Sequence, residues 1–425
     1  MTGAELHALA ARLFPIPRSL TGDGVRQSLA ILGEQIALEI REIPTGTPVF
    51  DWTVPREWRL REAHITAPDG RRIADAAGHN LQLLGYSAPF RGRIDLGELK
   101  RHLFTLPDQP DLVPYRTSYY KEQWGFCLPH RLVEALPEGD YEVVVDTELF
   151  AGSLTYGELA LAGETDEEVL FSTHCCHPSL ANDNLSGMVV ATELAARLAA
   201  RPRRRLSYRF LFLPGTIGAI AWLATNRERR ARIRHALVLA GLGAPGDFHY
   251  KKSRSGDAPI DREVASAFAR RGENLAVEEF VPFGYDERQY NAPGIGLDAG
   301  CLSRTPYGRY PEYHTSADNL DLIRPETLAG AVSALESVVD GLEGRECFRN
   351  LAPECEPQLG RRGLYRLIGG DDAGRERELA ILWMLNLSDG SHSLDDIAER
   401  SGISPAALRE AAEALVAAEL LARLR

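Results

Sequence analysis

Short apolar stretches alternate with longer amphipathic ones along residues 118–345, and this alternation limits the fold more than any other feature of the chain. The short stretches are rich in β-branched and aromatic residues, which favour strands. The longer ones repeat apolar residues at helical spacing. Strand–helix–strand units predict a mostly parallel or mixed sheet covered by helices, so the expected fold class is α/β. The predicted strands are 141–146, 169–173, 208–213 and 235–240, with helices over 185–199 and from 219.

Two segments differ from this alternating region. One carries short alternating runs and turn signals such as Pro68-Asp69-Gly70, which predict a β-rich insert. The other, at the C-terminus, predicts a helix over 379–387 and then two helices capped by Ser393 and Ser404, with Gly402 in the turn between them. The predicted domains are an α/β domain (1–49 and 118–348), an inserted β-rich domain (50–117) and a C-terminal helix-turn-helix unit (349–425).

The charge and cysteine content exclude several classes of protein. Lys and Arg number 48 against 60 Asp and Glu, a net charge of −12, which disfavours non-specific binding to nucleic acid. Six cysteines in 425 residues are too few for a disulfide scaffold, and none forms a C-x-x-C pair. The chain starts without the basic region of a signal peptide and has no apolar stretch long enough for a spanning helix. We therefore expect a cytoplasmic protein with reduced thiols and no nucleic-acid or membrane partner.

Two polar stretches contain candidate metal ligands. The first follows the predicted strand 169–173 and includes His177 and Asp183, at the strand edge where α/β proteins place their sites. The second includes His314, in a loop after an aromatic run. Neutral imidazole and carboxylate groups are natural zinc ligands. The alternatives are that Asp183 is a turn or capping residue and His314 a hydrogen-bonded loop histidine.

A third polar stretch, Asp286-Glu287-Arg288-Gln289, lies in a Tyr- and Phe-rich loop. Its arginine could clamp a carboxylate through two hydrogen bonds, although a surface ion-pair cluster would look the same. A Cys176–His177 dyad is not expected, because adjacent residues on an extended segment point in opposite directions. The candidate catalytic residues are Glu312 and Arg288, and the candidate substrate-binding residues are Asp286, Glu287, Arg288, Tyr307 and Arg309.

Taken together, the stretches HCCHPSLANDNLSG and YHTSAD resemble the aminopeptidase-like zinc hydrolase superfamily, which includes bacterial zinc aminopeptidases and glutaminyl cyclases. Further stretches, among them FPIPRSLTGDGVRQSL, GSLTYGE and YDERQYNAPGIGL, are similar to bacterial proteins with an aminopeptidase-like domain, a small inserted domain and a C-terminal winged helix. The resemblance covers nearly the whole chain. It implies a three-layer α/β zinc-aminopeptidase-like domain, with the β-rich insert and a winged helix at the C-terminus.

The resemblance also implies a site for one or two metal ions. The matching positions are His177, Asp183 as the bridging carboxylate, and His314, with His174 as the alternative first histidine. Two positions depart from the family pattern, because Gly215 and Ala244 stand where relatives carry Glu and Asp. Losing both carboxylates leaves a dication poorly compensated in a partly buried site. We therefore expect zinc to bind weakly or not at all, and ordinary aminopeptidase activity to be low.

These features predict an enzyme that acts on an amino-acid- or peptide-like small molecule through a degraded metal site. The resemblance places it in a biosynthetic pathway, because genes of this family often lie in polysaccharide or specialised-metabolite clusters. Two alternatives stay open. One is an active zinc-dependent aminopeptidase or amidohydrolase, and the other is a non-catalytic binding protein on the scaffold of an inactive hydrolase. The winged helix is expected to pack or form homo-oligomers and not to bind DNA, because residues 371–425 hold 11 acidic but only 6 basic side chains.

Overall fold

The computed structural model describes residues 1–364 and 372–424. The chain divides into two compact units. The larger unit comprises Met1–Asp261 and Phe268–Glu336, and the smaller comprises Arg262–Ala267 and Ser337–Arg425. Within the described part of the chain, we find no helix that is both long and apolar enough to cross a membrane.

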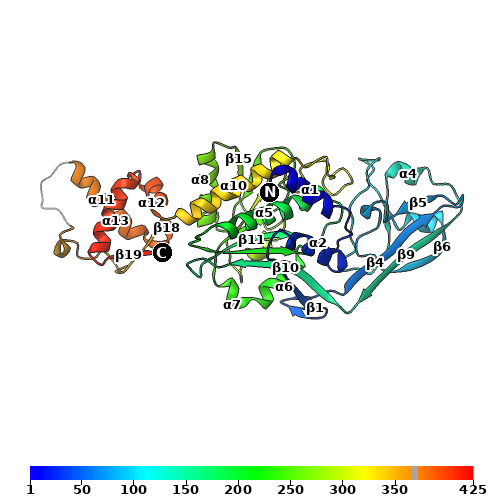
Figure 1. Cartoon of the computed structure of the whole chain (residues 1–425), viewed down its shortest axis with the longest axis horizontal. Coiled ribbons are helices and arrows are strands. Elements are labelled where there is room, and N and C mark those ends of the chain that lie inside the picture. Colours follow the sequence, from blue (N-terminus) through cyan, green and yellow to red (C-terminus); the bar gives the residue numbers. More distant parts are fainter. Residues whose placement is uncertain (365–371, 425) are drawn as a thin grey trace. The chain divides into compact units, whose positions relative to one another are not determined.

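The larger unit is built on an eight-stranded mixed sheet (Figure 1). Its central strands β12, β11, β13 and β16 are parallel, and antiparallel pairs flank them on both sides. The predicted α/β fold class is confirmed. The strand order is β1 (Glu39–Pro44), β10 (Ser153–Leu161), β12 (Ser207–Leu213), β11 (Glu168–His174), β13 (Ile233–Leu239), β16 (Ala299–Ser303), β14 (Phe248–Lys251) and β15 (Leu275–Glu278).

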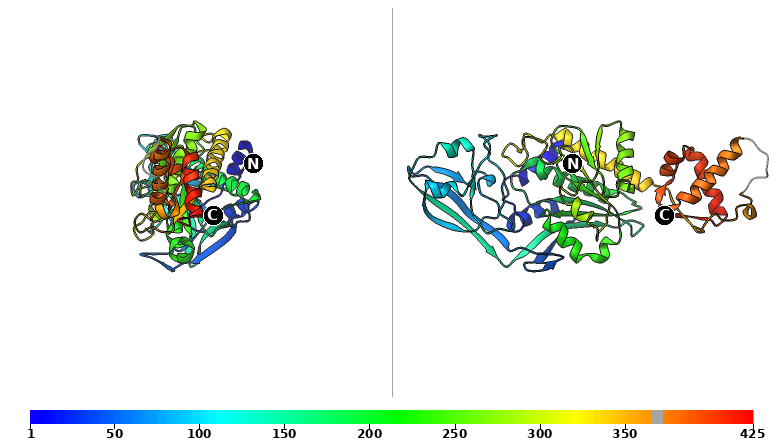
Figure 2. Two further views of the ribbon diagram at one scale, coloured as in Figure 1. Left: turned by 90° about the vertical axis from the view of Figure 1, so that its left-hand side faces the viewer. Right: turned by 180° about the vertical axis from the view of Figure 1, so that it is seen from behind.

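Helices cover both faces of this sheet. Strand β11 is buried along its whole length, which explains why it reads Val-Leu-Phe without polar alternation. Helices α1 (Gly3–Leu13) and α5 (Gly187–Ala200) lie on one face, and α6 (Ile217–Thr225) and α7 (Arg227–Arg230) lie on the other (Figures 1 and 2). The remaining helices of this part of the chain are α2 (Asp23–Gly33), α3 (Leu96–Lys100), α4 (His130–Glu134), α8 (Pro259–Arg271), α9 (Glu287–Tyr290) and α10 (Pro325–Gly344).

A second, four-stranded sheet forms the β-rich region of the same unit. Its order is β5 (Arg72–Asp75), β4 (Glu57–Thr66), β9 (Asp140–Phe150) and β6 (Phe90–Asp95). The predicted strand 141–146 therefore exists, but as part of β9 it pairs with β4 and β6 and not within the large sheet. Its alternating Tyr141, Val143 and Val145 fill the core of the small sheet, which thus takes a central strand from outside 50–117. Short two-stranded pairings complete the region: β2 (Pro48–Val49) with β3 (Trp52–Thr53), and β7 (Leu103–Phe104) with β8 (Phe126–Cys127).

The smaller unit has the predicted winged-helix composition. Its three-stranded sheet has the order β18 (Asp389–Ser393), β17 (Cys347–Asn350) and β19 (Leu421–Leu424), and its helices are α11 (Asp372–Leu387), α12 (Leu394–Ser401) and α13 (Pro405–Ala417). Ser393 and Ser404 cap α12 and α13 as expected. Gly402 ends α12 in the left-handed conformation, at φ 69°, which favours glycine.

Candidate active site at the ends of the parallel strands

The candidate ligands are held where β11 ends and α5 begins. His174 is the last residue of β11, and a tight turn over Ala181–Ser186 leads into α5. Amide hydrogen bonds fix this turn: Asn182 Oδ1 accepts from the N–H groups of Gly243 and Ala244, and Asp318 accepts from the N–H groups of Asn182 and Asp183. Asn182 and Asp318 are buried, so the backbone around Asp183 is held by the protein interior.

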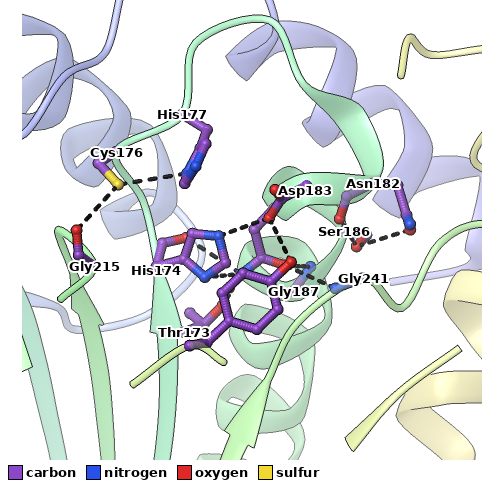
Figure 3. Close-up of polar contacts among 12 residues, drawn as sticks. Thr173, His174, Cys176, His177, Asn182, Asp183, Ser186, Gly187, Gly215 and Gly241 are labelled. Atoms are coloured by element: carbon purple, nitrogen blue, oxygen red, sulfur yellow. Dashed lines mark hydrogen bonds and ion pairs between the residues drawn. The ribbon is translucent and has the colours of Figure 1, made fainter. Parts of the chain in front are cut away.

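Asp183 lies between two histidines. Its Oδ1 is 2.8 Å from His174 Nε2, and its Oδ2 is 3.0 Å from His314 Nε2. The His177 ring lies 4.9 Å from the His174 ring and 5.4 Å from the His314 ring, centroid to centroid. Figure 3 shows His174, His177 and Asp183 facing one another. The structure therefore brings together every residue predicted as a metal ligand, including the alternative His174.

Burial sets the charge state of this cluster. Burial alone would raise the pKa of Asp183, but its interaction with the nearby His177 and its hydrogen bonds with His174 and His314 outweigh burial and hold that pKa well below its usual range. Burial lowers the pKa of His177 to about 3, so this imidazole is neutral at pH 7. The Asp183 carboxylate is therefore fully buried. His314 is 29% exposed, so solvent reaches the cluster on the side of this histidine.

These donors fit one zinc ion. His174, His177 and Asp183 offer ligand atoms that all lie within 4.8 Å of one another, and a neutral imidazole is the form that binds metal. No lysine or arginine is among the described hydrogen-bond or ion-pair partners of the buried Asp183 carboxylate. The cluster therefore has the charge and the ligand types of a mononuclear zinc site.

Neither position that departs from the family pattern supplies a carboxylate. A Cβ atom on Gly215 would lie 3.2 Å from His174 Cβ and 3.6 Å from Asp286 Oδ1, so a side chain at this position would start beside the cluster. Ala244 is buried, and its N–H group donates to Asn182. A second metal ion would therefore lack the acidic ligands that the family pattern provides at these two positions.

The Asp286-Glu287-Arg288 stretch is mostly buried, so the alternative of a surface ion-pair cluster is wrong. Asp286 is 1% exposed, neither carboxylate oxygen has a hydrogen-bond partner among the described residues, and burial raises its pKa to about 7. Glu287 is fully buried and forms an ion pair with Lys251. Arg288 is partly buried, and its Nε also has no hydrogen-bond partner in the described structure. Of these three residues, Asp286 lies beside the cluster, because it is close to the Gly215 position, which itself adjoins His174.

The structure places the other predicted site residues farther out. Tyr307 contacts Tyr285, 5.3 Å between ring centroids, and so lies one aromatic ring away from His174. Arg309 is mostly exposed and forms an ion pair with Glu278. Glu312 makes its described hydrogen bonds through its backbone carbonyl, and among the described contacts none joins its side chain to the cluster. Catalytic and binding roles for these residues stay predictions.

Three tyrosines at the cluster were not predicted from the sequence. Tyr285 stacks on His174 at 4.6 Å and donates its hydroxyl to Asp183 Oδ1 at 3.2 Å. Burial raises the pKa of Tyr285 well above its usual range, so this hydroxyl stays protonated. Tyr313 stacks on His314 at 3.9 Å, and the Tyr115 ring lies 4.9 Å from the His177 ring. Tyr285 and Tyr313 stand next to predicted polar residues in the sequence, and this adjacency is the signal that could have indicated these two tyrosines.

Cys176 does contact its neighbour His177. Its Sγ lies 3.4 Å from His177 Nδ1 and 3.8 Å from the Gly215 carbonyl oxygen (Figure 3). The expectation that the two side chains point apart is wrong, because β11 ends at His174 and residues 175–177 do not continue the strand. Burial raises the pKa of the Cys176 thiol to about 12, so the sulfur remains protonated and is a poor nucleophile.

Comparisons with known proteins place the chain in a family and agree with its fold. Residues 7–345 match a family described as a domain of unknown function, DUF4910, and residues 346–423 match a winged helix-turn-helix family. A Clostridium acetobutylicum relative, described as a candidate polysaccharide biosynthesis protein with an aminopeptidase-like domain, is 45% identical over 420 residues, which cover 99% of this chain and 96% of the relative.

Solved structures show the same similarity. A crystal structure of a candidate peptidase from Clostridium acetobutylicum is 44% identical and superposes with a TM-score of 0.83 over 99% of this chain and 96% of that one. The zinc aminopeptidase BSAP of Bacillus subtilis is 14% identical, with a TM-score of 0.58 over 80% of this chain and 94% of that one. An aminopeptidase from Aneurinibacillus, also 14% identical, has a TM-score of 0.51 over 79% of this chain and 93% of that one. The latter two comparisons concern the fold alone.

Proposed function

Because this chain belongs to the DUF4910 family and carries its aminopeptidase-like fold, we propose that it is an enzyme acting on an amino-acid- or peptide-like small molecule. The description of the Clostridium relative supports a role in polysaccharide biosynthesis. The substrate would then carry an amine or amide group and be consumed or modified on the way to a saccharide product.

One observation carries this proposal. The fully buried Asp183 is bracketed by His174 and His314 at the carboxyl end of a parallel strand, and His314 is open to solvent. A buried anion attracts a cation, either a metal ion or a substrate ammonium group. His174, His177 and Asp183 would hold zinc, which when bound polarises a substrate carbonyl.

The remaining residues of the site orient this centre. Tyr285 donates to Asp183 and stacks on His174, which fixes both side chains. Asp286 supplies a carboxylate close to the position where Gly215 has no side chain. We therefore assign Asp286 the place of the missing acidic group. The absence of side-chain acids at residues 215 and 244 also favours a second function, a non-catalytic protein that binds the same kind of molecule.

Metal analysis and turnover test the proposal together. After dialysis against trace zinc, we expect weak retention, at no more than one zinc ion per chain. Asp183→Asn should abolish both the retention and the hydrolysis of amino-acid amides, while Asp166→Asn, at a carboxylate that is 91% exposed, should leave both unchanged. Two zinc ions per chain, or full turnover by Asp183→Asn, would contradict the proposal. Amide binding without turnover by the unmodified protein would favour the binding protein.

A further inference from the structure

The winged-helix unit contains a cavity of its own. Its volume is about 780 Å3, which lies within the range of pockets that hold small molecules. The segment that follows β17, the C-terminal part of α11 and the start of β18 line it. All of these lining residues belong to the smaller unit, and none is a member of the histidine cluster. A ligand held in this cavity would therefore be a second one, separate from the substrate.

Ser388 is the strongest sign that the cavity holds a ligand. This residue lines the cavity and is 1% exposed, and its Oγ has no hydrogen-bond partner among the residues that the structure describes. Its backbone is satisfied, because its N–H donates to the Met384 carbonyl at 3.1 Å and its carbonyl accepts from the Asn350 N–H at 2.6 Å. A buried hydroxyl group without a partner costs free energy, which a polar ligand atom would recover.

Arg349 supplies a positive charge at the same cavity. It lies on β17 opposite Asp389 of β18, yet its side chain forms no ion pair within the described ranges. The Asp389 carboxylate is already engaged: Oδ1 accepts from the Ser391 N–H and hydroxyl groups at 2.8 Å, and Oδ2 lies 3.0 Å from His392 Nδ1. A guanidinium group with free N–H donors binds a carboxylate through two parallel hydrogen bonds. The cavity therefore suits a ligand that carries a carboxylate.

The other lining residues restrict the rest of the ligand. Glu356 is exposed, and in the described structure it forms no ion pair with Arg349 or with another basic residue. Leu382 and Leu385 of α11 add apolar surface. A polyanion such as a phosphate ester would meet Glu356 and Asp389 as like charges. A ligand with one carboxylate, one ammonium group and apolar side chains satisfies all of these groups, and a dipeptide has this composition.

We propose that this cavity is a binding site for a small zwitterionic peptide, with its carboxylate on Arg349, its ammonium group beside Glu356 and a polar backbone atom on Ser388. The apolar side chains of the peptide would lie against Leu382 and Leu385. This inference goes beyond the proposed function, because it assigns a ligand to the winged-helix unit and needs neither zinc nor turnover at the histidine cluster.

Alkylation of Cys355 provides a test that is local to this cavity. Cys355 lines the cavity and is exposed, whereas four of the other five cysteines are buried. The full-length chain is treated with iodoacetamide, and peptide mass spectrometry follows the modification of Cys355. We expect the dipeptide Leu-Leu, at saturating concentration, to slow this modification about fivefold or more. N-acetyl-Leu-Leu and Leu-Leu amide, which each lack one charge, should bind about tenfold more weakly.

Two variants test the assigned contacts. Arg349→Met should weaken the protecting affinity of Leu-Leu about tenfold, and Ser388→Ala about fivefold. Arg400→Met is the matched control, because Arg400 is exposed on α12 and is not a lining residue, so its affinity should not change. Thermal unfolding of Ser388→Ala should occur at no lower a temperature than that of the unmodified chain, because the variant removes an unpaired buried hydroxyl group.

The outcomes also separate this inference from the proposed function. The inference is overturned if Leu-Leu fails to protect Cys355 at about 10 mM, if the blocked dipeptides protect equally well, or if both variants keep the affinity of the unmodified chain. Asp183→Asn should be protected like the unmodified chain, and loss of protection in this variant would place the dipeptide at the histidine cluster instead. Full turnover by Asp183→Asn with intact protection would defeat only the proposed function.

Discussion

At the scale of single residues, the site is a set of buried groups whose partners come from distant segments. Asp183 and His174 are nine positions apart, whereas His314 and Tyr285 come from the second half of the chain. The sequence predicted His177, Asp183 and His314 because their residue types match zinc ligands. It could not show that His174 belongs to the same cluster, because this depends on the turn that brings Asp183 back to the end of β11.

Asp286 should make the stability of the protein depend on pH. Its pKa is raised to about 7 in the folded state, from 3.8, so the folded protein keeps a proton that the unfolded chain releases. Stability therefore falls as the pH rises from about 4 to about 7. In chelator-treated protein, Asp286→Asn should be more stable than the unmodified chain by on the order of 2 kcal/mol near pH 8, with little gain near pH 4. Urea unfolding at both pH values measures this, and an equal gain at both would contradict it.

Restoring acidic residues should strengthen zinc binding. A Glu side chain at position 215 would start 3.2 Å from His174 Cβ, at the edge of the cluster. We expect Gly215→Glu with Ala244→Asp to raise zinc affinity about tenfold or more, since each adds an anionic ligand to existing histidines. Elemental analysis after dialysis against trace zinc measures the change. The control is Gly294→Glu, at an exposed glycine with open space around it. Near-stoichiometric zinc in the unmodified protein would show that the acids are not needed.

At the scale of elements, the site depends on pairing between the loop of His314 and residues 113–116. The Tyr115 N–H donates to the His314 carbonyl at 2.7 Å, and the Ser316 N–H donates to Val113 at 2.8 Å. His314 has a φ of 54°, which is strained for a residue with a side chain. Residues 113–116, at the end of the β-rich region, thus hold the candidate ligand His314 in an unfavourable backbone conformation.

Ser316→Ala should loosen this pairing without touching the cluster. Ser316 Oγ accepts a hydrogen bond from the Val113 N–H at 3.0 Å, and losing it leaves a part-buried donor unpaired. We expect a loss of about 1 kcal/mol in the free energy of unfolding and weaker zinc retention. Ser255→Ala, which removes an exposed hydroxyl whose described partner is the Ser253 hydroxyl at 3.0 Å, is the control and should leave zinc retention unchanged. Unchanged zinc retention in Ser316→Ala would show that His314 keeps its place unaided.

Element prediction from the sequence worked where local signals suffice. The caps Ser393, Gly402 and Ser404 defined α12 and α13, because capping is a property of a few adjacent residues. The partners of a strand depend on residues far away in the sequence. Tyr141, Val143 and Val145 occupy alternate positions of β9 and lie in one core cluster, yet the sheet that β9 joins is decided by the apolar faces of β4 and β6.

At the scale of the whole molecule, the charge balance decides what the winged-helix unit can bind. Helix α13 carries one basic residue, Arg409, which forms an ion pair with Glu346. Residues 371–425 contain 11 acidic and 6 basic side chains, so the sign opposes contact with phosphate. We expect no shift of random duplex DNA at micromolar protein, from low to physiological salt. A salt-sensitive shift would contradict this and the proposal that the unit serves packing or self-association.

Strand β9 has a consequence for the integrity of the chain. It lies between β4 and β6 in the small sheet, and only Ala151 and Gly152 separate it from β10 in the large one. Excision of residues 50–117 would remove both neighbours of β9 and leave Tyr141, Val143 and Val145 as an uncovered edge, which is prone to aggregation. The same deletion would remove the residues that pair with the His314 loop. The β-rich region is therefore not a removable cassette, because both strand β9 and the loop of His314 depend on it.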